Sequence, residues 1–308
     1  MNKLAFVFPG QGAQYVNMAR EFYEEFEESK MIFEKAQKVL DFDLIDLCFN
    51  ENTRINETEY TQAAMVTAEV AILEHIKTLG VKPDVTAGLS LGEYTSLVAC
   101  GAIDFEDAVK LVRIRGKLMQ DSVPLGVGAM AAVMGMTADK IEEICALSNG
   151  KVSIANYNSP AQIVITGEAK ALSDISEKLI ENGAKKVVPL KVSGPFHSSL
   201  LIGAGEELYK HLVNVEITKP KYPYVSNVTA DYVEDEKVIA DLLKKQISSS
   251  VRWQQSVERM IENGVDTFIE IGPGKTLSSL IRRIDKNVKC INIEKVEDLS
   301  KLSEVIGC

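Results

Sequence analysis

The stretch "DVTAGLSLGEYTSLVACG" (residues 84–101) contains a strand, a sharp turn and a helix in direct succession. The apolar start predicts a buried strand, and the helix that follows is expected to stop at Gly101. At the turn the chain reads Gly-x-Ser-x-Gly, with Ser90 at its centre. This pattern is typical of a nucleophile elbow, which places a serine hydroxyl above a helix N-terminus. A turn that merely allows close packing of strand and helix is the alternative, and these residues alone do not decide.

The regions on both sides of this stretch repeat the alternation of strand and helix. "KLAFVF" (residues 3–8) is a continuous apolar run, as found in parallel strands that are buried on both faces. Helical patterns cover residues 18–40 and 62–79, and a third begins after the N-cap Asp104 and runs to about Met119. This alternation predicts the α/β fold class with a parallel sheet.

Residues 126–193 show a different order of elements, β-α-β-β-α-β, which is that of a ferredoxin-like subdomain. The expected elements are, in order, "GAMAAVMG", "TADKIEEICALS", "VSIANYN", "QIVITG", "AKALSDISEKLIENG" and "KKVVPLKVS". The chain then continues with the strand "YPYVSN", further helices, the strand "DTFIEIG" and a final helix "TLSSLIRRI". We therefore predict a large domain of residues 1–125 and 194–308, into which a ferredoxin-like subdomain of residues 126–193 is inserted.

The overall composition is that of a soluble protein. The 308 residues are 46% hydrophobic and carry a net charge of -10, which argues against a general nucleic-acid or anionic-membrane binder. No apolar stretch approaches the length of a membrane span, and the start of the chain lacks the pattern of a signal peptide. The five cysteines (Cys48, Cys100, Cys145, Cys290 and Cys308) form no Cys-x-x-Cys pair. We expect a cytoplasmic protein with reduced thiols and no metal site.

Two glycine-rich segments fall short of nucleotide-binding motifs. "GQGAQY" has Tyr15 where a dinucleotide fingerprint needs its third glycine, and "GPGKT" has Ile269 where a P-loop needs its first. Both are predicted to be strand-to-helix turns.

A nucleophilic serine needs a base, and the chain has only three histidines. His75 lies within a helical pattern and is expected on the helix surface, while His211 lies near a helix end and is expected to be structural. His197, in "SGPFHSS", lies where a strand ends and a helix begins, which is the edge of a parallel sheet where sites gather. His197 is therefore the predicted base.

Arg115 lies on the apolar face of the helix that follows Asp104. At about 100° per residue it falls in the middle of an arc that includes Ala108, Val112 and Met119. A buried arginine stays protonated and needs an anion. That anion is either a protein carboxylate such as Glu93 or a substrate carboxylate held by the guanidinium fork, and the periodicity does not choose between them.

Seven segments resemble, in the same order, the malonyl-CoA:acyl-carrier-protein transacylases of fatty-acid synthesis. They are "FPGQGAQ", "GLSLGEY", "RIRGKLM", "NYNSPAQIVITG", "SGPFHS", "QISSSVRW" and "IEIGPGKTLSSL". The resemblance implies an α/β-hydrolase-like large domain with the inserted ferredoxin-like subdomain. It also implies an acyltransferase that moves a malonyl group from malonyl-CoA to the phosphopantetheine thiol of acyl carrier protein. The reaction would proceed through a malonyl-serine and require no metal or bound cofactor.

The resemblance also implies a role for each matching residue. Ser90 would be the nucleophile, His197 its base, and Arg115 the partner of the malonyl carboxylate. The backbone amides of Gln11 and Leu91 would form the oxyanion hole, and the backbone carbonyl of Gln246 would orient His197. Asn158 would lie near the pocket, and Phe196 would narrow it against a 2-methyl branch. Many members have histidine before the nucleophile, whereas this chain has Leu89, which leaves the substrate preference open.

The carrier protein of this family is strongly acidic, so docking on an acidic chain requires a local basic patch. The candidates are Lys185, Lys186, Arg282, Arg283 and Lys286. We expect a monomer, because the sequence has no heptads and no extended apolar face. A serine esterase or thioesterase is an alternative, but that class has its histidine close to the carboxyl end, after the acid. A non-catalytic interaction module is another, and the choice between fatty-acid and polyketide synthesis stays open.

Overall fold

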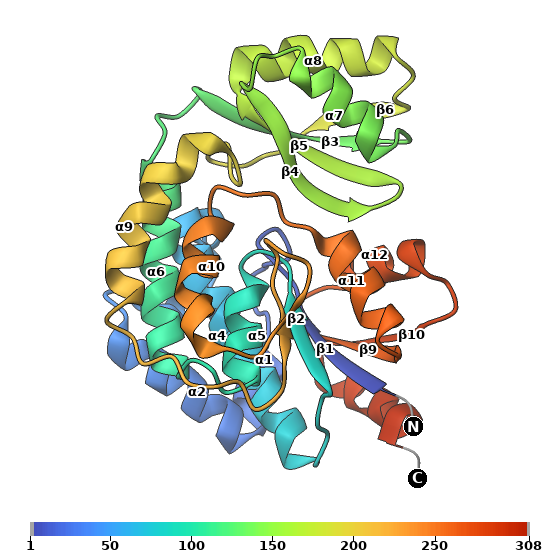
Figure 1. Ribbon diagram of the computed structural model, residues 1–308. Coiled ribbons are helices and arrows are strands. Elements are labelled where there is room, and N and C mark those ends of the chain that lie inside the picture. Colours follow the sequence, from blue (N-terminus) through green and yellow to red (C-terminus); the bar gives the residue numbers. More distant parts are fainter. Residues whose placement is uncertain (1–2, 307–308) are drawn as a thin grey trace.

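The computed structural model describes residues 3–306 and contains two β-sheets, one above the other in Figure 1. The six-stranded sheet has the order β10-β9-β1-β2-β7-β8 and belongs to the large domain. Its strands are β1 (Lys3–Phe8), β2 (Val85–Gly88), β7 (Tyr224–Val225), β8 (Tyr232–Val233), β9 (Val265–Ile271) and β10 (Lys289–Ile293). All neighbouring pairs are parallel except β7 and β8, which are antiparallel. The predicted α/β class with a parallel sheet is confirmed, with one antiparallel strand added at the edge.

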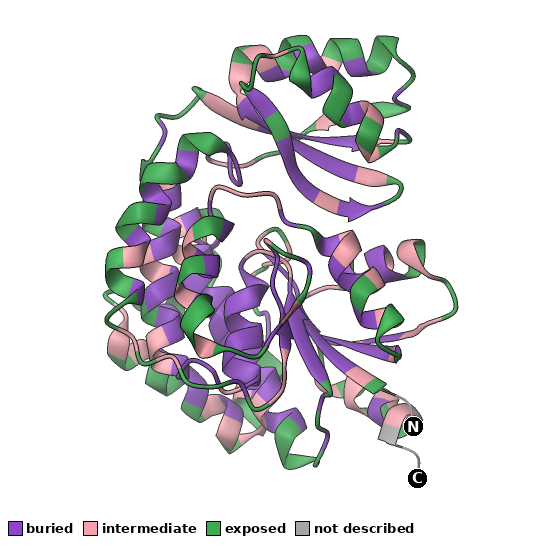
Figure 2. Ribbon diagram, in the orientation of Figure 1, coloured by how far each residue is buried: buried purple, intermediate pink, exposed green. Residues whose placement is uncertain are grey.

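Strand β1 shows why its apolar run is continuous. Its side chains alternate between the two faces, so that Phe6 and Phe8 join one hydrophobic cluster while Ala5 and Val7 join another. Because helices cover both faces, both sets of side chains are buried, as Figure 2 shows for the central strands.

The helices of the large domain form two unequal layers. Helices α1 to α6, α9 and α10 share the cluster of Phe6 and Phe8, and α11 and α12 share that of Ala5 and Val7. The α-helices are α1 (Arg20–Glu25), α2 (Glu27–Val39), α3 (Leu44–Phe49), α4 (Thr58–Thr78), α5 (Gly92–Ala99), α6 (Phe105–Asp121), α9 (Ile202–Leu212), α10 (Ile239–Gln246), α11 (Trp253–Glu262), α12 (Thr276–Ile284) and α13 (Ser303–Ile306). Short 3₁₀ helices cover Arg54–Asn56, Ser199–Leu201, Glu236–Val238 and Val296–Leu302.

The small sheet has the order β4-β5-β3-β6, with all pairs antiparallel. Its elements are β3 (Gly128–Met134), α7 (Ala138–Ala146), β4 (Val152–Ser159), β5 (Gln162–Glu168), α8 (Ala169–Glu181) and β6 (Lys186–Pro189). The predicted β-α-β-β-α-β subdomain is therefore confirmed, while the exact boundaries 126–193 stay a prediction. In β3, Ala131 and Val133 pack in the cluster of α7 and α8, whereas Met130 and Ala132 face the large domain.

Three expectations about the elements were wrong. The single helix over residues 18–40 is two helices, because Phe26 is extended and its ring stacks on His75 at a centroid distance of 3.5 Å. His75 is consequently not on the helix surface: it is buried, and its Nδ1 makes a hydrogen bond of 2.7 Å with Glu28. Helix α12 is not the last element, since β10, a 3₁₀ helix and α13 follow it.

Within residues 3–306, no helix is both long and apolar enough to cross a membrane. The four cysteines in this range are buried free thiols, and Cys308 lies outside the described residues.

Candidate active site

A pocket of about 220 Å³ is lined by residues of both domains, including Leu89 and Ser90 in the turn that follows β2. The large domain contributes its polar side chains Gln11, Gln62, Ser90 and Arg115. The small sheet contributes an apolar wall and three amides: Met130, Ala132, Val164, Asn156, Asn158 and Gln162. The segment that returns from the small to the large domain adds Phe196 and His197.

The turn at Ser90 has the strained geometry of an elbow. Ser90 has φ of 53°, in the left-handed region that L-residues seldom adopt. The flanking glycines are required by close contact: a Cβ on Gly88 would lie 2.0 Å from the carbonyl of Gly92, and one on Gly92 would lie 2.1 Å from the Phe8 oxygen. Only glycine permits this approach of strand and helix, so the Gly-x-Ser-x-Gly pattern has a steric cause.

His197 has the position and the tautomer that a base for Ser90 would need. Its Nε2 lies 2.7 Å from Ser90 Oγ, and its Nδ1 lies 2.8 Å from the backbone oxygen of Gln246. Because a carbonyl only accepts, Nδ1 carries the proton and Nε2 is free to accept from the serine hydroxyl. Burial, and secondarily the charge of Arg115, lower the pKa of His197 to about 4. The imidazole is therefore neutral at pH 7.

Arg115 is almost completely buried, at 1% exposure, and its guanidinium lies within hydrogen-bond distance of Ser90. Nη1 donates to Gln62 Oε1 at 2.8 Å, and Nη2 donates to Gln246 Oε1 at 3.0 Å and to Ser90 Oγ at 3.1 Å. None of these partners is charged, and no carboxylate among the described residues forms an ion pair with Arg115. The direct Glu93 pair, one of the two alternatives left by the sequence, is absent from the structure.

Three further polar residues surround the elbow. Gln246 Nε2 donates to the backbone oxygen of Ser90 at 2.8 Å and to Glu93 at 2.6 Å. Asn227 Oδ1 accepts from the Ser90 backbone N–H at 2.6 Å. Burial raises the pKa of Glu93 to about 7, while the hydrogen bond from Gln246 is the largest opposing influence. Sequence reasoning missed Asn227, Gln62 and this contact of Glu93; the one usable signal was that Asn227 is the last residue of a predicted strand, "YPYVSN".

Of the remaining predicted site residues, Gln11, Asn158 and Phe196 line the pocket, whereas Leu91 does not. Among the described residues, no group accepts a hydrogen bond from the backbone N–H of Gln11 or of Leu91, so both donors are available. The Gln11 side chain donates to Thr58 Oγ1 at 3.0 Å. Asn158 Oδ1 has no hydrogen-bond partner among residues 3–306.

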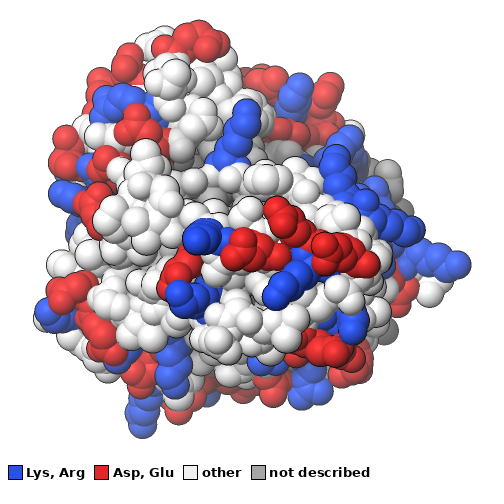
Figure 3. All heavy atoms as spheres, turned by 90° about the horizontal axis from the view of Figure 1, so that it is seen from above, with Lys and Arg blue, Asp and Glu red and all other residues white. Residues whose placement is uncertain are grey.

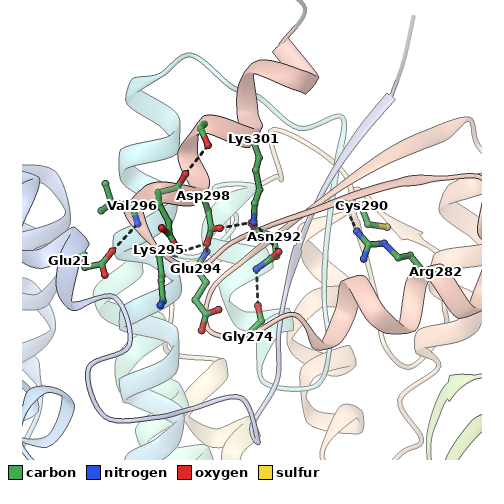
Figure 4. Close-up of polar contacts among 12 residues, drawn as sticks. Glu21, Gly274, Arg282, Cys290, Asn292, Glu294, Lys295, Val296, Asp298 and Lys301 are labelled. Carbon is green, nitrogen blue, oxygen red and sulfur yellow. Dashed lines mark hydrogen bonds and ion pairs between the residues drawn. The ribbon is translucent and has the colours of Figure 1, made fainter.

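The basic residues predicted to dock the carrier protein differ in their contacts. Arg282 Nη2 donates to the Cys290 backbone oxygen at 2.8 Å, across to β10, as Figure 4 shows. Arg283 Nη1 donates to Gln162 Oε1 at 3.3 Å and so connects α12 with the β4–β5 hairpin beside the pocket. Lys185 and Lys186 are exposed, and Lys186 pairs with Met134, which in turn faces Gln162. Figure 3 shows basic side chains gathered along the right-hand edge, the side of α12 in Figure 1.

Comparisons with known proteins agree with this geometry. The acyl transferase domain family matches residues 5–301. The malonyl CoA-acyl carrier protein transacylase of Bacillus subtilis (strain 168) is 43% identical over 303 residues, covering 97% of this chain and 96% of the relative.

Solved structures give the same result. The malonyl CoA-acyl carrier protein transacylase from Clostridium perfringens has a TM-score of 0.95 and 46% identity, over 99% of this chain and 97% of that one. A malonyl-transacylase solved in complex with a type II PKS acyl-carrier protein has a TM-score of 0.95 and 36% identity, over 99% and 100% of the two chains. With its serine elbow, neutral histidine and buried arginine at one pocket, this chain belongs to the acyl transferase domain family.

Proposed function

We propose that the protein transfers the malonyl group from malonyl-CoA to the phosphopantetheine thiol of acyl carrier protein. The observation that carries this proposal is the position of Ser90 Oγ, which lies 2.7 Å from the His197 base and 3.1 Å from the buried Arg115 fork. A nucleophile beside both a base and a cation suits an acyl group that bears a carboxylate. The names of the relatives, malonyl CoA-acyl carrier protein transacylase, agree with this substrate.

The proposed cycle is ping-pong acyl transfer through Ser90. His197 Nε2 takes the hydroxyl proton while Oγ attacks the thioester carbon, and the backbone N–H groups of Gln11 and Leu91 stabilise the oxyanion. The C–S bond then breaks, and coenzyme A leaves as a thiol with the proton from His197. In the second half the carrier thiol gives its proton to His197, attacks the malonyl-serine and releases Ser90 as the hydroxyl. Serine, histidine and amides supply all of this chemistry, so the proposed cycle uses no metal or cofactor.

Arg115 supplies the selectivity for a diacid. Its fork rests on neutral oxygens, and a malonyl carboxylate would give it a charged, bidentate partner instead. An acetyl group offers no such partner, so it gains none of this binding energy. Phe196 and Asn158, which also line the pocket, are assigned to the shape and polarity around the acyl group, and Leu89 to its mouth.

The carrier protein is proposed to dock beside the β4–β5 hairpin. Arg283 reaches this hairpin, and Lys186 lies on the same end of the small sheet. Their backbones pair with Met134, but the side chains of Lys185 and Lys186 make no hydrogen bond or ion pair with any other residue that the structure describes, so their charges are available to an acidic partner. Arg282 is the weaker candidate because its guanidinium is already bound to a carbonyl. A monomer in the cytoplasm remains our expectation.

Intact mass spectrometry after mixing with malonyl-CoA tests the function. We expect a malonyl adduct on the wild-type protein and none on Ser90→Ala, and we expect holo acyl carrier protein to remove the adduct and gain the malonyl mass. Rapid release of free malonate without a carrier would instead identify a thioesterase. No adduct at all would identify a non-catalytic protein and overturn the proposal.

A further inference from the structure

Glu93 is a buried carboxylate beside the site that the proposed cycle does not use. It lies in the first turn of α5, three positions after the nucleophile, and is 0% exposed. Its Oε2 accepts from Gln246 Nε2 at 2.6 Å and from the backbone N–H of Asn227 at 3.3 Å. Its Oε1 has no hydrogen-bond partner among the described residues. The carboxylate therefore joins two segments that come from distant parts of the sequence.

These two partners of Glu93 hold both sides of the strained nucleophile. Asn227 accepts from the Ser90 backbone N–H at 2.6 Å, and its own Nδ2 donates to the Gly88 oxygen at 2.7 Å. Gln246 Nε2 donates to the Ser90 backbone oxygen at 2.8 Å. A residue with φ of 53° keeps that conformation only when its surroundings hold it. Both residues that hold it donate to Glu93, Gln246 through its side chain and Asn227 through its backbone N–H.

Glu93 and the Ser90 backbone oxygen together determine which way the Gln246 amide points. An ionised carboxylate only accepts hydrogen bonds, so the NH₂ group of Gln246 must face Glu93. The amide oxygen then faces Arg115, whose Nη2 donates to it at 3.0 Å. The reversed amide would place its NH₂ against the Arg115 donors and its oxygen against the carboxylate, which would lose both bonds.

We propose that Glu93 is a positioning residue for acyl transfer, which anchors Asn227 and Gln246 and thereby holds the Ser90 backbone and directs the Arg115 fork. The inference rests on the proposed function, because it concerns how the malonyl carboxylate and the nucleophile are aligned. Holding the Ser90 backbone affects the transfer of every acyl group, whereas directing the Arg115 guanidinium affects only acyl groups that carry a carboxylate. The two effects can therefore be separated by comparing malonyl-CoA with acetyl-CoA.

The test compares Glu93→Ala, Glu93→Asp and Glu93→Gln with wild type, using kcat/KM for malonyl-CoA and for acetyl-CoA. Glu69 provides the matched control: it is also 0% exposed, accepts from Thr95 on α5, and among the described residues makes no hydrogen bond or ion pair with Ser90 or Arg115. Glu69→Ala and Glu69→Gln make the same chemical changes one helix away. Circular dichroism and thermal unfolding check each variant for folding.

We expect Glu93→Ala to lower kcat/KM for malonyl-CoA about 10²-fold and to lower the malonyl-to-acetyl ratio about tenfold. Glu93→Asp, whose shorter side chain cannot reach both donors, should lower the ratio in the same direction and serves if the alanine variant does not fold. Glu93→Gln keeps an acceptor oxygen and places its NH₂ on the side of the unpartnered Oε1, so it should remain within about tenfold of wild type. The Glu69 variants should leave the ratio unchanged.

An unchanged ratio in both Glu93→Ala and Glu93→Asp would overturn the inference, as would a Glu93→Gln variant as impaired as Glu93→Ala. A ratio that falls equally in the Glu69 variants would show a general packing effect and overturn it too. Failure of the wild-type protein to transfer malonyl would instead overturn the proposed function, so the two failures are distinct.

Discussion

The two walls of the pocket differ in what they contribute. The large-domain wall brings Ser90, Arg115 and Gln246 into one hydrogen-bonded cluster, whereas the small-sheet wall presents only uncharged side chains, three apolar ones such as Met130 and Val164 and three amides. Every charged or reacting group in the pocket comes from the large domain or from the segment that returns to it. The reaction thus depends on the large domain, and the small sheet closes and shapes the space in which it occurs.

Replacing Arg115, in the large-domain wall, should have the largest effect on activity. Arg115→Ala should lower kcat/KM for malonyl-CoA by about 10²–10³-fold, because a buried charged partner of the substrate carboxylate is lost. Transfer of acetyl should fall much less, so the malonyl-to-acetyl ratio should drop. Steady-state kinetics with both thioesters measures this, with Arg113→Ala as a control on the same helix but paired with Asp41 and Glu59. An unchanged ratio would contradict the assignment of Arg115.

The pH dependence of acylation tests the state of His197. Only neutral His197 accepts the Ser90 proton, and its pKa of about 4 keeps it neutral well below pH 6. At pH 5.5 a histidine with the usual pKa of about 6.5 would have lost about tenfold in activity, whereas this protein should retain most of it. Stopped-flow acylation rates between pH 4 and 8, with acetyl-CoA as a second substrate without an acyl carboxyl, would measure the midpoint.

Glu93 titrates within the same range, because burial raises its pKa to about 7. Its proton can lie on the unpartnered Oε1 and leave Oε2 accepting, so we expect no loss from this step. A midpoint near pH 6.5 in the acylation rate would show that His197 is solvated in the working enzyme.

Replacing Phe196 tests how the pocket limits the size of the acyl group. Phe196→Ala should raise the ratio of methylmalonyl to malonyl transfer by about tenfold, near the lower end of the roughly 10–200-fold (about 1–3 kcal/mol) by which a hydrophobic pocket discriminates one methyl group. Competition between the two thioesters, read by mass spectrometry of the carrier protein, measures the ratio. Val164→Ala is the companion variant on the small sheet, and an unchanged ratio in both would show that the methyl branch is excluded elsewhere.

The smallest expected effect belongs to the surface lysines. The double change Lys185→Glu and Lys186→Glu should raise the KM for the carrier protein several-fold and leave acylation by malonyl-CoA unchanged, since exposed charges interact weakly and are screened by salt. The same change at Lys110 and Lys117, on the exposed side of α6, provides a control of equal charge. Unaltered carrier kinetics would exclude the hairpin end as the docking surface.

Local patterns predicted the elements that a short segment specifies by itself. The strand at residues 3–8, the elbow at Ser90 and the N-cap at Asp104 depend on neighbouring residues, and all three are present. The break at Phe26 was not predictable in this way, because it depends on stacking against His75 from a helix far along the chain. The late strand β10 was missed because its pattern is short and its burial depends on pairing with β9.

The amino-acid sequence by itself determined the α/β class, the inserted subdomain and the sharp turn at Ser90, because periodicity and glycine placement express local geometry. The roles of Ser90 as nucleophile and His197 as its base stay predictions. The sequence also showed that Arg115 needs an anion, but it left the identity of that anion open. Only the tertiary structure decided that Glu93 binds Gln246 and Asn227 rather than Arg115. The physical reason is distance along the chain: Gln246 lies 153 positions and Asn227 lies 134 positions from Glu93, and only folding brings these groups within hydrogen-bond reach.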